Sequence, residues 1–385
     1  MNPSALGADQ PAVEVDSPIV SMRPWFTEAD AEAVADQVCS GFVGPGRKTR
    51  EFADALAALA GRRFCELTTS GTIALSVAAR AIGLQSGDEI IVPSYGVVST
   101  INAFASFGFR PRLADIDRIT GSLTAASVAS RLTSRTRAVC YVNFSGCTGP
   151  DLAEIEQLCS ARAIALIEDA ACAVGQRFNG RAAGSFGTVS TFSFSVPKVI
   201  TTGQGGAILT NAVPINNATI RFIDQGDTDW RRTNLNRDIG NNLRHNDILS
   251  AFGMAQLATL DKRLSRRRTA YAAMREVLGD RLFAVPGNEA PLHNIVLAAD
   301  PDGLITRLDA ARVKAIRQYR TLSQHPPYRD LADADFVNAD LWTEHAVYLP
   351  FGTGLSEGQA LRVGEAVRAS SVELLRFSTL ARSNL

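Results

Sequence analysis

Apolar positions follow two alternating patterns along the middle of the chain. Short apolar runs predict β-strands at residues 65–68, 89–92, 112–115, 138–143 and 163–168. Apolar residues at helical spacing predict helices between these strands, at 73–82, 98–107, 123–132 and 152–161. Sustained β-α alternation is typical of an α/β fold with a mainly parallel sheet between helices. Ligands of such folds bind beyond the carboxyl ends of the strands, so functional side chains are expected there.

The flanking regions suggest three parts. Residues 1–20 lack periodicity and are expected to form a flexible N-terminal arm, followed by a large domain at 21–257. This domain should begin with helices at 27–39 and 51–60, joined by a loop at 40–50. Residues 258–385 mix helices with a short strand and predict a smaller C-terminal α+β domain. The elements expected there are helices at 257–278, 304–315 and 357–369 and a strand at 295–298.

Charge and composition exclude several function classes. The chain has 39 basic and 39 acidic residues, so no net charge favours nucleic acid or an anionic membrane. The basic run 266–268 lies in a predicted helix and is interpreted as a solvated face. Six cysteines without C-x-x-C spacing indicate reduced thiols in a cytoplasmic protein, and no signal peptide or membrane-length apolar run appears. His293, His325 and His345 lack metal-ligand spacing, so no metal is expected; they are interpreted as surface or loop residues.

One lysine, Lys198, lies in a turn between two strand-like runs at 188–194 and 207–210. Pro197 stops a helix from starting, and the glycines at 203, 205 and 206 allow the backbone to approach another group closely. The ordinary interpretation is a solvated loop lysine. The alternative is an amine held at the end of a strand for chemistry.

Two further positions decide between these interpretations. Ser70-Gly71-Thr72 opens a helix and could bind a phosphate at the positive end of its dipole, or could serve only as a cap. Asp169 follows a buried strand, where an unpaired carboxylate is costly; it is either paired or a structural N-cap. An amine, a carboxylate and a phosphate-binding helix start are jointly what pyridoxal 5'-phosphate (PLP) requires.

A set of motifs carries a resemblance to a known family. Between about residues 25 and 260 the chain resembles the DegT/DnrJ/EryC1/StrS family of PLP-dependent sugar aminotransferases, which have the aspartate aminotransferase fold type I. The matching motifs are Ser70-Gly71-Thr72, residues 87–94, Glu168-Asp169-Ala170-Ala171, Gly184-Ser185-Phe186-Gly187, Phe192-Ser193-Phe194 and Lys198 through Gly206. The C-terminal likeness is weaker and rests on residues 324–328, 348–350 and 354–356.

The resemblance implies a role for each matched position. Lys198 would form the Schiff base with PLP and Asp169 would pair with the pyridine nitrogen, while pyridoxamine 5'-phosphate would be the intermediate. Gly71, Thr72 and Ser193 would bind the phosphate. Asn242 would reach the phosphate of the neighbouring subunit, which implies a homodimer with a shared active site.

Three positions depart from the family pattern. Val97 stands where members commonly have an aromatic residue that stacks on the cofactor, Cys172 where they have glutamine, glutamate or histidine, and Gln204 where they have glutamate. Tyr95 could take over the stacking role from a shifted position. Candidate substrate contacts are Tyr95, Arg244 and His325.

The resulting expectation is an aminotransferase that moves an amino group, from L-glutamate, onto a nucleotide-linked 4-keto-6-deoxyhexose. One alternative is a PLP-dependent sugar dehydratase of the same fold, but dehydratases of the family have histidine at the lysine position, and Lys198 argues against that. The other alternative is a non-catalytic PLP-binding regulator, motivated by Val97 and Gln204.

Overall fold

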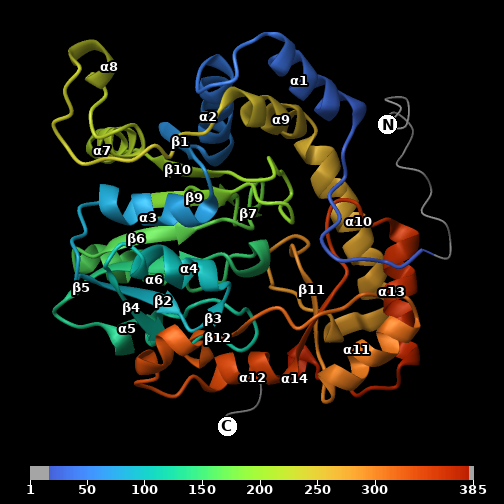
Figure 1. Cartoon of the computed structure of the whole chain (residues 1–385). Helices are drawn as coiled ribbons and strands as arrows, with labels where there is room; N and C mark the ends of the chain where they lie inside the picture. Colours follow the sequence, from blue (N-terminus) through green and yellow to red (C-terminus); the bar gives the residue numbers. More distant parts are fainter. Residues whose placement is uncertain (1–16, 381–385) are drawn as a thin grey trace.

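The computed structural model describes residues 17–380 and is built around a seven-stranded sheet (Figure 1). In spatial order the strands are β1 (Phe64–Thr68), β10 (Gly206–Thr210), β9 (Val189–Ser193), β6 (Ala165–Asp169), β5 (Thr136–Val142), β2 (Glu89–Pro93) and β4 (Arg110–Ala114). Strand β10 runs antiparallel to its neighbours β1 and β9, whereas the pairs from β9 to β4 are parallel. The predicted α/β class with a mainly parallel sheet is confirmed.

Helices cover both faces of the sheet because its strands are apolar on both sides. In β2 and β5, Ile90 and Cys140 face one core cluster, whereas their neighbours Ile91 and Val139 face another. Burying such side chains stabilises the fold by about 1.5–3 kcal/mol each. One face carries α3 (Gly71–Ala81), α4 (Val98–Ala105) and α7 (Val213–Ile223); the other carries α2 (Arg47–Ala60), α5 (Ala125–Arg131) and α6 (Leu152–Ala161).

The C-terminal part forms a smaller α+β unit beside the sheet (Figure 1). Its strands β11 (Asn294–Leu297) and β13 (Ala346–Leu349) pair antiparallel. Against them pack α10 (Leu260–Leu278), α11 (Pro301–Ala310) and α13 (Glu357–Ala369). The boundary predicted after residue 257 lies near the break between α9 (Asp247–Ala258) and α10. Helix α12 (Val337–His345) returns to the large domain, where Trp342 Nε1 donates to the Arg118 carbonyl at 2.9 Å.

The remaining elements are short or lie at the periphery. They are α1 (Glu28–Cys39), β3 (Tyr95–Gly96), β7 (Arg177–Phe178), β8 (Arg181–Ala182), α8 (Trp230–Thr233), β12 (Arg320–Thr321) and α14 (Phe377–Leu380). Within residues 17–380, no helix combines the length and the apolar character that crossing a bilayer would require.

Two local predictions need correction. Residues 17–20 were expected to belong to a flexible arm, but Ile19 is buried and bridges to Val313 of the small domain; residues 1–16 of that arm lie outside the described residues. Helix α2 begins at Arg47, inside the predicted loop. The Asp247 carboxylate of α9 accepts hydrogen bonds from the amides of Gly46 and Thr49, both at 2.8 Å. This cap comes from far along the chain, so local sequence does not reveal it.

Candidate active site

Lys198 lies in the connection between the antiparallel strands β9 and β10. The amide of Phe194 donates to the Gly205 carbonyl at 2.9 Å and closes the base of this connection. Gln256 of α9 holds it from outside, because its Oε1 accepts from the Thr201 amide at 3.0 Å. Lys198 is half-buried, and its Nζ donates to the Cys172 sulfur at 2.9 Å. It is therefore not the freely solvated loop lysine of the ordinary interpretation.

Asp169 is the last residue of β6 and is only 3% exposed. Its Oδ2 accepts from the Thr100 hydroxyl and its Oδ1 from the Ala171 amide, each at 3.1 Å. Burial raises the pKa of this carboxyl group, while the Ala171 amide and the positive charge of Lys198 lower it. The carboxylate and the amine are therefore close enough to interact electrostatically, at the carboxyl ends of neighbouring parallel strands.

The start of α3 is pressed against the ends of β9 and β10. Ser70 caps the helix by accepting from the Ile73 amide at 3.2 Å. A Cβ on Gly71 would lie 2.7 Å from the Ser193 Cβ, and a Cβ on Gly206 would lie 2.4 Å from the Ser70 carbonyl oxygen. Both positions require glycine because of this close approach. The structure thus brings Gly71 and Ser193 together at a helix N-terminus, with Thr72 in its first turn.

These groups fit PLP. The helix start with its glycines and the Ser193 hydroxyl offers donors to a phosphate. The buried Asp169 carboxylate keeps capacity to accept a hydrogen bond from a protonated ring nitrogen. Within the part of the chain that the structure describes, no three His, Cys, Asp or Glu side chains are grouped as metal ligands.

A cavity of about 610 Å³ joins two residues that are far apart in sequence, Val97 and His325. Val97 precedes α4 and is 41% exposed, and His325 is half-buried. Tyr319 lines the same cavity. Burial raises the pKa of its hydroxyl. Its ring packs edge-on against Tyr95 and His293, a position that no sequence motif indicated.

Tyr95 occupies a different environment from the one predicted. It is 1% exposed and its ring packs against Phe144, Tyr319 and Trp342. Its hydroxyl lies 3.1 Å from that of Tyr348. A ligand would have no access to this ring, so the structure does not support a stacking or substrate role for Tyr95.

Arg244 and Asn242 lie beside the end of β1. Arg244 Nη1 pairs with Asp224 at 3.0 Å, and its Nε donates to the Asn242 side-chain oxygen at 3.1 Å. Arg244 lines a separate cavity of about 370 Å³ together with Glu66. Asn242 is exposed on its own protomer. Its predicted contact with a second subunit, and the substrate role of Arg244, stay predictions.

Two buried basic residues near Lys198 were missed. His293, expected at the surface or in a loop, is 2% exposed, and its amide donates to the Ser145 hydroxyl at 2.9 Å. Burial and the charges of Lys198 and Arg267 hold the pKa of His293 well below its usual value. Arg267 was assigned to a solvated face but is 4% exposed. Its Nη2 donates to the Ala290 carbonyl at 2.6 Å, while Nη1 is buried without a partner.

The apolar residues that follow His293 in β11 are the one local sign of its burial. No local sign indicates the burial of Arg267. Both of its neighbours in the sequence are arginines, and basic residues occur on every side of this helix. Only the packing of α10 against both domains distinguishes the buried Arg267 from the arginines beside it.

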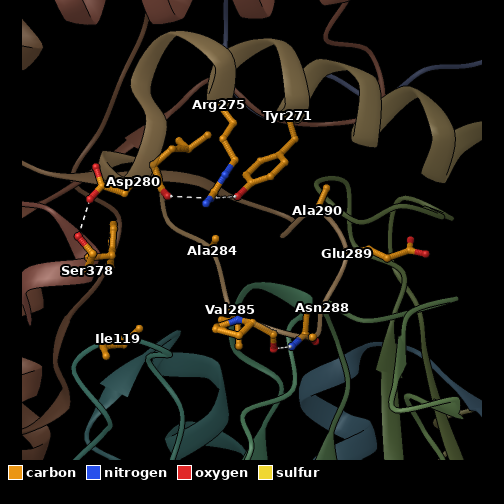
Figure 2. A pocket seen from close by; sticks show the side chains of 14 residues that line it. Ile119, Tyr271, Arg275, Asp280, Ala284, Val285, Asn288, Glu289, Ala290 and Ser378 are labelled. Carbon is orange, nitrogen blue, oxygen red and sulfur yellow. Dashed lines mark hydrogen bonds between the residues drawn. The ribbon is translucent and has the colours of Figure 1, made fainter. Parts of the chain in front are cut away.

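A further cavity, of about 570 Å³, lies at the seam between the domains (Figure 2). In Figure 2 Tyr271 and Arg275 project into it from α10, with the Arg275 Nη1 donating to the Tyr271 hydroxyl at 2.9 Å. The opposite wall includes Val285 and Asn288, and Asn288 ties this segment to the large domain by accepting from the Thr148 amide at 2.8 Å. None of the residues predicted for the site lines this cavity.

Comparisons with known proteins agree with the fold. GDP-perosamine synthase of Caulobacter vibrioides is 33% identical over 332 residues, covering 83% of this chain and 88% of that protein. A dTDP-4-dehydro-2,3,6-trideoxy-D-glucose 4-aminotransferase of Saccharopolyspora spinosa is 31% identical, covering 89% and 94%. The solved structure of the aminotransferase TlmJ from Streptoalloteichus hindustanus superposes with a TM-score of 0.85 at 28% identity, covering 92% and 99%.

The family comparison covers nearly all of the described chain. Residues 25–368 match the DegT/DnrJ/EryC1/StrS aminotransferase family, whose members are PLP-dependent. The match extends well beyond the region of about 25–260 on which the motifs were clearest. The chain belongs to the DegT/DnrJ/EryC1/StrS aminotransferase family.

Proposed function

We propose that this aminotransferase moves an amino group from L-glutamate to a nucleotide-linked 4-keto-6-deoxyhexose, with PLP bound through Lys198. The main support for the proposal is that the Lys198 amine, the buried Asp169 carboxylate and the start of α3 lie at one edge of the sheet. The two relatives described above, named for GDP-perosamine and for a dTDP-linked keto-sugar, support the substrate class.

When bound, PLP supplies an aldehyde carbon and a ring that accepts electrons from the substrate carbon. Asp169 keeps the ring nitrogen protonated, because its negative charge lies in a buried place where it strongly favours a positive partner. Ser193, Gly71 and Thr72 hold the phosphate by hydroxyl and amide donors at the positive end of α3.

Lys198 then moves a proton. Its half-buried Nζ would take the proton from the donor α-carbon and deliver it to the cofactor carbon, and would carry out the reverse transfer on the acceptor side; in each half the amine must be neutral when it takes the proton. Cys172 orients Lys198 while the amine is free, since the sulfur accepts its hydrogen bond at 2.9 Å.

The acceptor sugar is placed in the cavity of about 610 Å³ lined by Val97, Tyr319 and His325. Cavities of roughly 300–1,000 Å³ are usual for small-molecule sites. Val97 is a small apolar side chain where the family commonly has an aromatic ring, so it leaves more room beside the cofactor. Tyr319 and His325 supply hydrogen-bonding groups for the hydroxyls of a sugar.

The active enzyme is a homodimer in this proposal. Residues 225–241 leave the body of the protomer around α8 (Figure 1), and two of their apolar side chains, Leu235 and Ile239, are 63% and 89% exposed. Asn242, at the end of this segment, is also exposed. A second copy would cover the apolar side chains and would receive the Asn242 amide at its phosphate site.

The test is an assay of the purified protein with L-glutamate and candidate GDP- and dTDP-linked 4-keto-6-deoxyhexoses. Formation of 2-oxoglutarate together with an equal amount of amino sugar supports the proposal. Ammonia release from an amino sugar without 2-oxoglutarate would support the dehydratase instead. An absorbance band that disappears with borohydride but does not respond to any amino donor would support the regulator.

A further inference from the structure

The contact between Cys172 and Lys198 has a chemical consequence beyond transamination. We infer that these two side chains form a reversible covalent sulfur–nitrogen link when a peroxide reaches the site while the lysine amine is free. The link itself depends only on the contact seen in the structure. Its effect on activity rests on the proposed function, in which Lys198 bonds to the cofactor.

The geometry places both reactants in contact before any reaction. Lys198 Nζ lies 2.9 Å from the Cys172 sulfur, a hydrogen-bond distance. Cys172 is in the turn that follows Asp169 and Lys198 is in the turn between β9 and β10, and both turns are anchored on adjacent strands of the sheet. A bond between them therefore needs side-chain rotation and no rearrangement of the fold.

Exposure separates Cys172 from most of the other cysteines. Cys172 is half-buried, whereas Cys65, Cys140, Cys147 and Cys159 are buried. Burial raises the pKa of Cys159 to about 11 and that of Cys147 to about 12, so these thiols stay protonated and unreactive at neutral pH. Cys39 is exposed, and within the described part of the chain no amine forms a hydrogen bond with its sulfur. Cys39 is therefore a matched control.

Arg267 is a buried cation near the Cys172 sulfur. Arg267 Nη1 is buried without a hydrogen-bond partner. Burial lowers the pKa of this guanidinium to about 10, and Cys147 and Cys172 act in the opposite direction, which places both sulfurs within its field. A nearby cation stabilises the anionic sulfur species through which thiol oxidation proceeds.

The reaction balances in two steps. Hydrogen peroxide oxidises the Cys172 thiol to a sulfenic acid, its O–O bond breaks, and one water leaves. The lone pair of the neutral Lys198 amine then attacks the sulfur; the S–O bond breaks, and the departing hydroxide takes a proton from nitrogen as a second water. The product is an S–N bond, and two equivalents of an added thiol return the thiol and the amine with formation of a disulfide.

The link would inactivate the enzyme reversibly under oxidising conditions. An amine bonded to sulfur cannot bond to the cofactor aldehyde, so the linked protein would be inactive. A lysine already bonded to the cofactor cannot attack the sulfenic acid. Oxidation should therefore capture the enzyme in the half of the cycle in which Lys198 is free.

The experiment compares the holoenzyme before and after the lysine is freed. It is freed by L-glutamate without acceptor and, separately, by hydroxylamine, which removes a lysine-bound carbonyl whatever the amino donor is. Each sample receives hydrogen peroxide, is digested and is analysed by mass spectrometry. We expect a Cys172–Lys198 linked peptide, lighter than its two parts by two hydrogen atoms, to form severalfold faster in the freed samples and to disappear with dithiothreitol.

Three variants are compared with the wild type. Cys172→Ser and Lys198→Arg should both lack the linked peptide, and in Lys198→Arg the Cys172 sulfur should proceed to irreversible higher oxides. Cys39→Ser should behave as the wild type in both linkage and recovery. Far-UV circular dichroism of each variant establishes that it is folded.

Two results would overturn the inference: a wild type whose Cys172 is oxidised to the sulfinic acid with Lys198 unmodified, or no linked peptide in either the freed or the untreated sample. A linked peptide that forms at the same rate in both samples would show that Lys198 was not bonded to the cofactor, which counts against the proposed function and leaves the link standing. If no link forms but 2-oxoglutarate is still produced, the proposed function stands and only the link fails. If the link forms in a protein that does not transaminate, the proposed function fails and the link stands.

Discussion

The two walls of the candidate active site are built in different ways. The cofactor wall comes from the large domain and consists of Lys198, Asp169 and the start of α3, all at the carboxyl edge of one sheet. The opposite wall includes Tyr319 and comes from the C-terminal part, and the buried ring of His293 packs edge-on against Tyr319. Short sequence motifs predict the residues of the cofactor wall. The residues of the opposite wall come together only when the chain folds, so no short motif predicts them.

The walls also differ in how they use charge. On the cofactor wall burial raises the pKa of the Asp169 carboxyl group, and the neighbouring Lys198 lowers it. On the opposite wall burial dominates, because it keeps the His293 ring neutral and raises the pKa of the Tyr319 hydroxyl. The first wall is suited to moving electrons and protons, and the second to enclosing the hydroxyl-bearing sugar part of the proposed substrate.

The largest effect is expected at the cofactor wall, from Lys198→Ala. Without the amine no group bonds to the cofactor or moves the substrate proton, so kcat should fall by about a thousandfold or more. The measurement is 2-oxoglutarate formation from L-glutamate. Lys314→Ala, at a lysine that is about half exposed and paired with Asp309 in the small domain, is the matched control and should keep wild-type activity. Near-normal turnover of the Lys198 variant would remove the cofactor wall from the mechanism.

Neighbouring carboxylates on β6 give the second test. Asp169→Asn removes the charge that keeps the ring nitrogen protonated, and kcat should fall by about a hundredfold with the cofactor still bound. Glu168 points to the other face of the sheet and accepts from the Asn143 side chain at 2.7 Å and the Phe186 amide at 2.8 Å.

Glu168→Gln should therefore cost about 1–3 kcal/mol of unfolding free energy and leave kcat within a fewfold of wild type. Steady-state kinetics and urea unfolding of both variants separate the two roles. An equal loss of kcat in both would show that Asp169 acts only through packing.

Lowering the pH should reduce the free energy of unfolding through His293. Native His293 has a pKa well below 6.5, so as the pH falls below about 6.5 the unfolded chain binds a proton that the folded chain does not. The unfolding free energy therefore falls with pH, by about 2 kcal/mol for such a histidine between pH 6.5 and 5.

Urea unfolding of the wild type and His293→Gln at both pH values isolates this contribution, since the remaining titrating groups are shared. The wild type should lose about 2 kcal/mol more than the variant. His345→Gln, at a half-buried histidine of the small domain, serves as the control. Parallel losses in wild type and His293→Gln would mean that folded His293 takes up the proton.

The smallest effect is expected from Tyr319, which is proposed to contact the acceptor. Tyr319→Leu should raise the acceptor KM by about tenfold, the loss of roughly 1.4 kcal/mol of contact energy, while Tyr319→Phe should have a smaller effect. The half-reaction with glutamate should be unchanged in both. Stopped-flow measurement of that half-reaction distinguishes the result from damage to the cofactor wall, which would slow it as well.

The sequence by itself determined the α/β class and the family, and it led to the prediction of the cofactor wall, because each depends on residues that are neighbours in the chain. Alternation of apolar runs marks the strands, and a glycine-rich turn or a helix cap follows directly from the local residue types. Lys198, Asp169 and Ser70-Gly71-Thr72 are all motifs of this kind. Parallel strands then bring their ends to one edge, which is why positions far apart in number could be predicted to meet.

Tertiary structure alone decided the features that depend on which side of an element is covered. The Asp247 carboxylate caps α2 from a distant helix, and Tyr95 is buried in an aromatic cluster. Arg267 is buried although its neighbours Arg266 and Arg268 are half-buried and exposed. The Cys172–Lys198 contact belongs to the same class, because it joins two turns that no local pattern relates. The physical reason is that burial and long-range contacts depend on how the whole chain packs. Hydrophobic periodicity indicates only which face of a single helix or strand is covered.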